Sequence, residues 1–171
     1  MQMARQYHFL RRGDSVLDLG SSPGGWLQVA HQIVGNGGYL LGVDKDTVEK
    51  LPFANIDTIE LDVTDQTVIS KIESMRSQKY DAVLSDLAQN VSGVWEVDHA
   101  RQIELARCAL RVARTELRPS GNMMVKVFQG SELKEFQTEM KSCFRTLRNV
   151  KPPASRPESA ELYFLGLEFL G

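Results

Sequence analysis

This 171-residue chain has only two cysteines, no long apolar runs and no excess of positive charge. Its two cysteines, Cys108 and Cys143, form no C-x-x-C pair and have no histidine beside them in the sequence, which argues against a disulfide framework and a metal site. No stretch approaches 18 consecutive apolar residues, and the N-terminus lacks a signal-peptide pattern. We therefore expect a cytoplasmic protein with buried thiols, no bound metal and no contact with a membrane.

Positive charge is not in excess, because 20 lysines and arginines stand against 22 aspartates and glutamates, for a net charge of −2. A pI near 5.9 argues against a protein that holds nucleic acid by its overall charge. Arginine is nevertheless grouped locally, at Arg11 and Arg12 and again between Arg101 and Arg118. We interpret the second group as a solvated helix face.

The remaining composition is that of an ordinary globular protein, with 42% apolar and 25% charged residues. A chain of this length can build one sizeable core but not comfortably two. We predict a single domain over residues 1–171, in which residues 1–13 are a polar lead-in, and we expect a monomer.

Residues 16–26 are the stretch around which the chain is organised. A short apolar run with one acidic residue passes into a Gly/Ser/Pro turn, and a helical apolar pattern follows at once. Gly20, Gly24 and Gly25 carry no Cβ, so the backbone can adopt positive φ and approach a ligand closely. Their spacing is not G-x-G-x-x-G, which weakens a plain dinucleotide-binding interpretation.

Acidic residues follow several apolar runs that we predict to be strands. Asp44 follows the run 39–43, Asp62 follows a third strand at 58–61, and Asp86 follows a fourth at 80–85. Strands that alternate with helices form a mainly parallel sheet, whose carboxyl ends lie along one edge. We therefore expect Asp18, Asp44, Asp62 and Asp86 to converge on one cleft, where Asp44 is placed to bind a ribose diol.

The same patterning predicts the other elements, listed here by residue number: helices at 24–34, from an N-cap at Thr64 to about 77, at 98–117 and from about 129 to 143, and strands at 122–128, 146–150 and 161–169. Lys126 is unusual within its apolar run, since burying an ammonium group costs several kcal/mol unless it is paired. An edge lysine that reaches solvent is the alternative interpretation.

Four motifs in this order are similar to those of the FtsJ/RrmJ ribosomal RNA 2′-O-methyltransferases: Asp-Leu-Gly-Ser-Ser-Pro-Gly-Gly-Trp at 18–26, Ser-Asp-Leu-Ala-Gln-Asn-Val-Ser-Gly at 85–93, Val-Lys-Val-Phe-Gln-Gly at 125–130 and Ser-Arg-Pro-Glu-Ser-Ala-Glu-Leu-Tyr at 155–163. The resemblance implies an α/β, Rossmann-like S-adenosylmethionine-dependent methyltransferase fold. It would have a seven-stranded, mostly parallel sheet, the last strand antiparallel, with helices on both faces.

The resemblance also assigns roles to residues. It places Gly24 and Trp26 at the methionine part of the cofactor S-adenosylmethionine, Asp44 at the ribose, Asp62 at the adenine and Asp86 near the sulfonium. Its Lys-Asp-Lys-Glu tetrad is matched by three candidate catalytic residues, Asp86, Lys126 and Glu161. A ribose 2′-hydroxyl is a poor nucleophile, so a lysine that takes its proton would assist methyl transfer. The resemblance places the other tetrad lysine in a basic helix that would lie just before Met1.

The predicted function is therefore methylation of a ribose 2′-hydroxyl of RNA, with ribosomal RNA, at a large-subunit uridine, as the leading partner. Three alternatives stay open at this point. The substrate could be transfer RNA or a messenger RNA cap, the domain could bind S-adenosylmethionine without catalysis, or the chain could be a Rossmann oxidoreductase. The last alternative gives Trp26 and Lys126 no evident part in hydride transfer.

Overall fold

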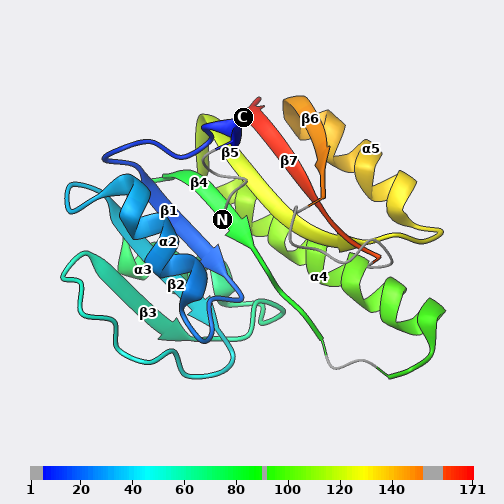
Figure 1. Ribbon diagram of the computed structural model, residues 1–171, viewed down its shortest axis with the longest axis horizontal. Coiled ribbons are helices and arrows are strands. Elements are labelled where there is room, and N and C mark those ends of the chain that lie inside the picture. The colour runs from blue at the N-terminus through cyan, green and yellow to red at the C-terminus, as the bar shows by residue number, and fades with distance from the viewer. Residues whose placement is uncertain (1–5, 90–91, 152–159) are drawn as a thin grey trace.

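Seven strands form one sheet in the order β3-β2-β1-β4-β5-β7-β6 (Figure 1). The structure is a computed structural model that describes residues 6–89, 92–151 and 160–171. The strands are β1 (Ser15–Leu19), β2 (Tyr39–Asp44), β3 (Ile56–Glu60), β4 (Tyr80–Ser85), β5 (Leu117–Phe128), β6 (Phe144–Val150) and β7 (Glu161–Phe169). The first five strands pair in parallel, so their carboxyl ends lie along one edge.

Helices cover both faces of the sheet: α2 (Gly25–Val34) on one face, and α3 (Val68–Met75), α4 (Trp95–Glu116) and α5 (Leu133–Cys143) on the other (Figure 1). The apolar stripe of α2 packs with Val16, Leu40 and Met124, whereas the other three helices share a core with Leu17, Leu41 and Met123. These neighbours alternate along their strands, as the two-residue period of a strand requires. The predicted fold class is confirmed.

Strand β7 lies between β5 and β6 and runs antiparallel to both of them. In the β5–β7 register Lys126 stands opposite Tyr163, and Phe128 stands opposite Glu161. Lys126 therefore belongs to a central strand with partners on both sides, which excludes the interpretation of an edge lysine.

Several predicted boundaries are wrong. The third strand begins at Ile56, the helix predicted from residue 98 begins at Trp95, and β5 begins at Leu117. Thr64 is not the N-cap of α3, because that helix begins at Val68 after Thr67. The amide and hydroxyl of Thr64 instead donate to the carboxylate of Asp62, at 2.8 and 2.7 Å, and this local turn delays the start of the helix.

The lead-in contributes to the core, contrary to the prediction of a merely polar segment. Phe9 and Leu10 are buried and pack in the cluster on the α2 side of the sheet. The backbone carbonyl of Phe9 accepts a hydrogen bond from the side chain of Asn122, at 3.0 Å, which fastens the segment to β5. Residues 1–5 of the lead-in lie outside the described part, as do residues 90–91 and the loop residues 152–159 of the sequence motifs.

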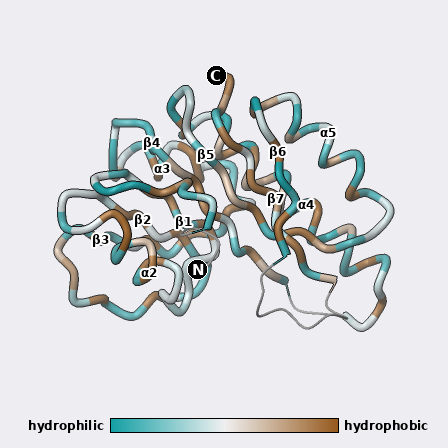
Figure 2. The backbone as a smooth tube through the Cα atoms, turned by 45° about the horizontal axis from the view of Figure 1, so that its top comes forward, coloured by the Kyte–Doolittle hydropathy of each residue, from teal (hydrophilic) through white to brown (hydrophobic). Residues whose placement is uncertain are grey.

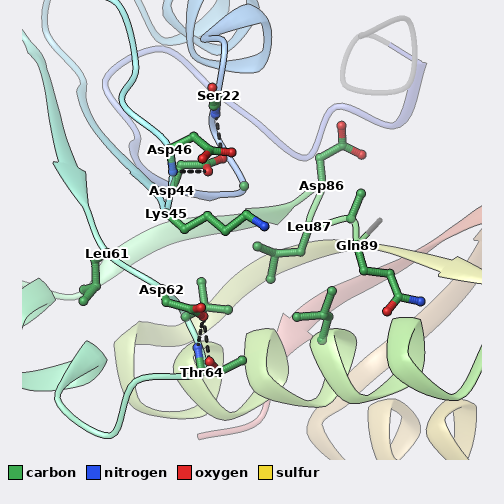
Figure 3. Close-up of a pocket in the computed structure, with 14 residues that line it drawn as sticks. Ser22, Asp44, Lys45, Asp46, Leu61, Asp62, Thr64, Asp86, Leu87 and Gln89 are labelled. Carbon is green, nitrogen blue, oxygen red and sulfur yellow. Dashed lines mark hydrogen bonds between the residues drawn. The ribbon is translucent and has the colours of Figure 1, made fainter. Parts of the chain in front are cut away.

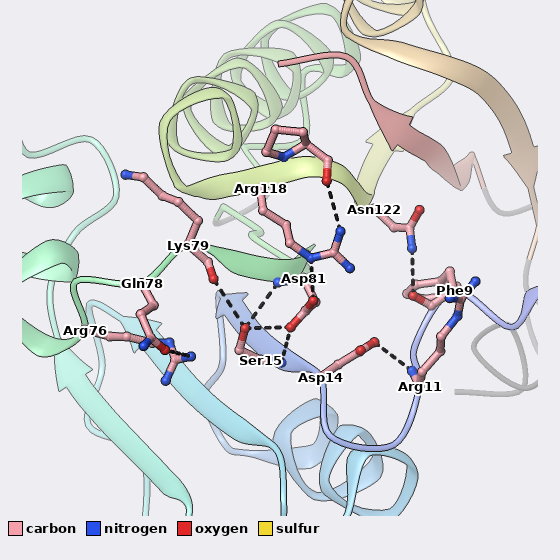
Figure 4. A network of polar contacts seen from close by, with 11 residues as sticks. Phe9, Arg11, Asp14, Ser15, Arg76, Gln78, Lys79, Asp81, Arg118 and Asn122 are labelled. Atoms are coloured by element: carbon pink, nitrogen blue, oxygen red, sulfur yellow. Dashed lines mark hydrogen bonds and ion pairs between the residues drawn. The ribbon is translucent and has the colours of Figure 1, made fainter.

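A polar network ties three strands together at the amino ends of the sheet (Figure 4). The amide and hydroxyl of Ser15 donate to Oδ2 of Asp81, at 2.7 and 2.8 Å, and Nε of Arg118 donates to Oδ1 at 2.6 Å. Burial alone would raise the pKa of Asp81, but the bonds from Ser15 and Arg118 outweigh it and lower the pKa. Asp81 is therefore a shared acceptor for β1, β4 and β5.

Hydrophilic and hydrophobic stretches are interspersed along the coloured part of the backbone (Figure 2). Within the described residues, none of the helices combines the length and hydropathy that a bilayer-spanning helix requires. Both cysteines are free thiols, with Cys143 buried and Cys108 half-buried.

Candidate active site

A cleft of about 330 Å³ opens at the carboxyl ends of β1, β2 and β4 (Figure 3). Asp44, Asp62 and Asp86 contribute to its wall, so the structure brings three of the four predicted aspartates together. The wall is completed by Gly20, Ser22, Lys45, Asp46, Leu61, Val63, Thr64, Leu87, Ala88, Gln89 and Leu105. The position agrees with the general rule that open α/β sheets bind ligands outside their strand ends.

The glycine turn forms the floor of this cleft. Gly20 has φ of 82°, and a Cβ there would lie 2.8 Å from the amide nitrogen of Leu87, which only glycine avoids. The amide of Ser22 donates to Oδ2 of Asp44 at 2.9 Å. The turn after β1 is thus packed against the end of β4 and hydrogen-bonded to the end of β2.

Asp44 and Asp62 are each held by hydrogen bonds from the backbone nearby. Besides Ser22, the amide of Asp46 donates to Asp44, at 2.9 Å from Oδ1. The amide and then the hydroxyl of Thr64 lower the pKa of Asp62, and so keep this carboxylate charged. Both carboxylates are therefore oriented before any ligand arrives and retain lone pairs for further donors.

Asp18 does not line the cleft, contrary to the prediction that all four aspartates converge there. Its side chain is completely buried beneath the turn, and neither carboxylate oxygen has a hydrogen-bond partner among the described residues. Burial, and then the charges of Asp86 and Asp44, raise its pKa well above the usual value. Burial without a hydrogen-bond partner therefore favours the neutral, protonated form of this carboxyl group.

Lys126 is almost completely buried, with 7% of its surface exposed, and it is paired with Asp86. Its Nζ donates to the backbone oxygen of Asp86 at 3.0 Å and lies 3.3 Å from Oδ1 of the same residue. The ammonium group is thus held at the rim of the cleft by the strand end that supplies Asp86. Nε2 of Gln102 on α4 binds the carbonyls of Leu87 and Lys126, at 3.0 and 3.3 Å, and links the two strand ends.

Tyr163 is a site residue that the sequence interpretation missed. Its hydroxyl donates to Oδ1 of Asp86 at 2.8 Å and lies 3.3 Å from Oε1 of Glu161. Burial first, and then the charge of Asp86, raise the pKa of this phenol well above its usual value, so the hydroxyl remains a donor. Asp86, Lys126 and Glu161, predicted from the resemblance, are therefore brought together through Tyr163.

Gly24 and Trp26 lie outside the wall of the cleft. Gly24 has φ of 110° ahead of α2 and faces Val48 and Leu51. The Trp26 ring packs against Tyr163, with ring centroids 5.7 Å apart. Gly25 is the first residue of α2 and does not adopt positive φ. The part of these residues in cofactor binding stays a prediction.

Lys45 was also missed, although it directly follows Asp44. Its side chain extends across the cleft from the end of β2 toward Leu87 (Figure 3). Its charge contributes to the low pKa of Asp62, after the bonds from Thr64. The lysine is exposed and places a positive charge in the wall of an otherwise acidic cleft.

Chemically, the site combines two parts. The cleft offers carboxylates at three strand ends, which suit hydroxyl and amine donors and positive charge. Beside it stands a buried amine that is oriented by one carboxylate, with a neutral phenol on the same carboxylate. Such a constellation can bind a polar, cationic ligand in the cleft and transfer a proton at its rim.

Comparison with known families gives one match over almost the whole chain. The model of the FtsJ-like methyltransferase family matches residues 1–169. The chain is 45% identical to "Ribosomal RNA large subunit methyltransferase E" of Methanothrix thermoacetophila, over 99% of this chain and 65% of that protein. It is 43% identical to the protein of the same name from Methanococcus aeolicus, over 100% of this chain and 64% of the relative. The chain thus spans just under two thirds of these relatives.

Solved structures share the fold. A Plasmodium falciparum protein assigned as a ribosomal RNA methyltransferase superposes with a TM-score of 0.86 at 25% identity, over 99% of this chain and 94% of that one. Fibrillarin of Aeropyrum pernix, solved with natively bound S-adenosyl-L-methionine, superposes with a TM-score of 0.63 at 18% identity, over 92% of this chain and 67% of the other. The second likeness concerns the fold alone.

Proposed function

Because the chain belongs to the FtsJ-like methyltransferase family, we propose that it is an S-adenosylmethionine-dependent RNA 2′-O-ribose methyltransferase that acts on ribosomal RNA, at a uridine of the large subunit. The names of its relatives in Methanothrix and Methanococcus support ribosomal RNA as the substrate.

The residues of the cleft fit S-adenosylmethionine by the chemistry of their donor and acceptor groups. Asp44, held at the end of β2, would accept from the ribose hydroxyls, and Asp62 would accept from the exocyclic amine of adenine. Asp86 would lie near the sulfonium, whose positive charge its carboxylate favours. Gly24 and Trp26 are proposed for the methionine part, beyond the present wall of the cleft. When bound, the cofactor supplies an electrophilic methyl group.

The chain's own residues would prepare the ribose hydroxyl for that reaction. In its neutral form, Lys126 would accept the proton of the 2′-hydroxyl through Nζ. The two contacts of Nζ with Asp86 hold the amine in place, and Tyr163 holds Asp86 from the other side. Glu161 would orient this group through Tyr163, and burial keeps bulk water away from the amine.

The observation that carries the proposal is the burial of Lys126 beside Asp86 at the rim of an acidic cleft. Burying a lysine in the middle of a sheet costs free energy unless its charge is paired. A purely structural ion pair could lie anywhere in the sheet, whereas this one lies at the strand end next to a ligand cleft. A proton acceptor for a hydroxyl needs that position.

The test is transfer of a labelled methyl group from S-adenosylmethionine to RNA by the wild-type protein and Lys126→Ala. We expect 2′-O-methylation of large-subunit ribosomal RNA by the wild type, and loss of transfer in the variant with cofactor affinity within a few-fold. Total transfer RNA and capped messenger RNA serve as the competing substrates.

Two results would overturn the proposal. A folded Lys126→Ala protein that binds the cofactor and methylates at the wild-type rate removes Lys126 from the chemistry. Calorimetry that detects NADH but neither S-adenosylmethionine nor S-adenosylhomocysteine removes the methyltransferase function itself.

A further inference from the structure

A pair of aromatic side chains stands at the rim of the candidate site. Trp95, the first residue of α4, stacks on Phe128, the last residue of β5, with ring centroids 6.2 Å apart and planes inclined by 17°. In Figure 1 the amino end of α4 and the carboxyl end of β5 lie on the same side of the molecule. The pair thus bridges a helix start and a strand end.

Trp95 is unusually accessible for a tryptophan, with 47% of its surface exposed. Its neighbours Val94 and Val97 are exposed as well, and these three are among the five large apolar side chains that are exposed in the described part of the chain. A single exposed apolar residue is ordinary, but a group of them that includes an aromatic ring often marks a surface that binds a partner.

The pair is close to the reacting group. Phe128 follows Lys126 by two residues at the end of β5, so the two positions lie roughly 7 Å apart along the strand. The register partner of Phe128 is Glu161, and that of Lys126 is Tyr163. A nucleotide next to the ribose at Lys126 would therefore have this end of β5 within reach.

Trp95 is also held in place by the same helix that organises the site. The carboxylate of Asp98, one turn further along α4, accepts from the amides of Ser92 and Gly93, at 2.8 and 3.2 Å. Gln102, the next turn, binds the strand ends at Leu87 and Lys126. A platform fixed to this helix needs no ordering when a ligand binds, which favours affinity.

We propose that Trp95 and Phe128 form a stacking platform for an unpaired nucleobase of the RNA substrate, next to the ribose on which Lys126 acts. The inference rests on the proposed function and names the form of RNA that the site takes, namely an unstacked loop or single strand. RNA is commonly recognised through unpaired bases that stack on aromatic side chains. We prefer RNA to a protein partner because the platform lies at the end of the strand that carries Lys126, the residue proposed to act on the RNA ribose.

The platform carries no positive charge, and its neighbour Glu96 is acidic. Stacking releases no counterions, whereas contacts to phosphate make affinity depend on salt. The proposal therefore predicts that loss of Trp95 weakens RNA binding by the same factor at low and at high salt. Loss of a phosphate-binding lysine or arginine would instead reduce the salt slope.

The experiment compares Trp95→Ala, Trp95→Phe and the control Met75→Ala, which removes another exposed apolar side chain, at the end of α3. We expect Trp95→Ala to raise the KM for a ribosomal RNA fragment about 5- to 100-fold, with Trp95→Phe in between. The control should match the wild type, and all variants should keep their cofactor affinity and melting temperature. An unchanged KM in Trp95→Ala would overturn the proposal and leave the patch to a protein partner.

A second measurement separates this inference from the proposed function. The chain has two tryptophans, so a Trp26→Phe background reports the fluorescence of Trp95 alone. We expect a single-stranded oligouridylate to quench that emission and a fully paired duplex of the same length to quench it much less. Methylation is measured with the wild-type protein, because Trp26 is itself a proposed cofactor residue. If the wild type methylates no RNA but Trp95 is quenched, the platform stands and the proposed reaction fails. If RNA is methylated but the oligouridylate does not quench Trp95, the proposed stacking on Trp95 is wrong.

Discussion

Lys126 and Tyr163 face each other across β5 and β7 and bind the same carboxylate oxygen, Oδ1 of Asp86. The amine lies 3.3 Å from that oxygen and the phenol 2.8 Å. Directly opposite residues of an antiparallel pair have neighbouring side chains on one face of the sheet, so the register alone places the two donors together. Asp86 arrives between them from the end of β4.

Removing one of the two donors should affect the reaction more than the fold. Tyr163→Phe keeps the ring that packs against Trp26 but loses the hydrogen bond to Asp86. A bond to a charged acceptor is worth about 1.5–3 kcal/mol, so we expect kcat to fall about 10- to 100-fold while cofactor affinity stays within a few-fold. The measurement is kcat against pH, because a changed position of Asp86 should also displace the profile. Equal kcat and profile for both proteins would show that Tyr163 only packs.

Asp44 should govern cofactor capture. Asp44→Ala should weaken S-adenosylmethionine binding by about 1.5–3 kcal/mol, because a charged acceptor for the ribose hydroxyls is lost. The matched control is Asp46→Ala, which removes a neighbouring exposed carboxylate of the same cleft and should change the Kd only a few-fold. Calorimetry together with melting curves checks both. If the two variants lose equal affinity, the general negative charge of the cleft, and no ribose contact, explains the effect.

The raised pKa of Asp18 predicts a decline of stability as pH rises. Its pKa is 3.8 in the unfolded chain and well above that in the folded protein, so in the window between the two values only the unfolded state releases the proton. The free energy of unfolding should then fall by up to about 1.4 kcal/mol per pH unit from this group. Asp18→Asn removes the titration, so the stability of the variant relative to the wild type should increase as pH rises above 3.8 toward the folded-state pKa. Urea unfolding at each pH measures this difference, and a difference that does not change with pH would contradict the raised pKa.

Asp81 predicts the opposite dependence at the other end of the sheet. Its pKa is lowered in the folded state, so its stabilisation is present above pH 3.8 and is lost as pH falls through the folded value. Asp81→Asn should cost about 1–2 kcal/mol at pH 7, reduced from the full value of its bonds because Arg118 is half-exposed. The difference should shrink below pH 4 in denaturant titrations. Glu73→Gln, which removes an exposed ion pair with Lys79, should cost less than about 0.5 kcal/mol.

Much of this architecture could be predicted from local patterns. Apolar runs that alternate with helical patterns indicate a parallel sheet, and a residue directly after a strand must lie at its carboxyl edge. That reasoning is enough to bring Asp44, Asp62 and Asp86 to one cleft. It fails for Asp18, because this residue lies within β1 and points into the interior beneath the turn.

The other features of the site and the fold depend on contacts between residues distant in sequence or on competing local structures, which sequence patterns do not reveal. The role of Tyr163 follows from the β5–β7 register, which is set by pairing between segments distant in sequence. The start of α3 depends on the competition between a helix and the turns made by Asp62 and Asp65 with the threonines that follow them. Burial of Phe9 depends on Asn122, far along the chain.

The insertion of β7 between β5 and β6 affects the order in which ligand binding and catalysis become possible as the chain is synthesised and folds. The residues that line the cleft all precede β5, and α2 and the strands β1, β2 and β4 can assemble as soon as they have been synthesised. Asp86, Lys126 and Tyr163 can meet only when Glu161–Phe169, which is synthesised after all the other strands, has paired with β5. A nascent chain should thus be able to bind a small ligand before it can react with it. Catalytic activity would appear only once the sheet is complete.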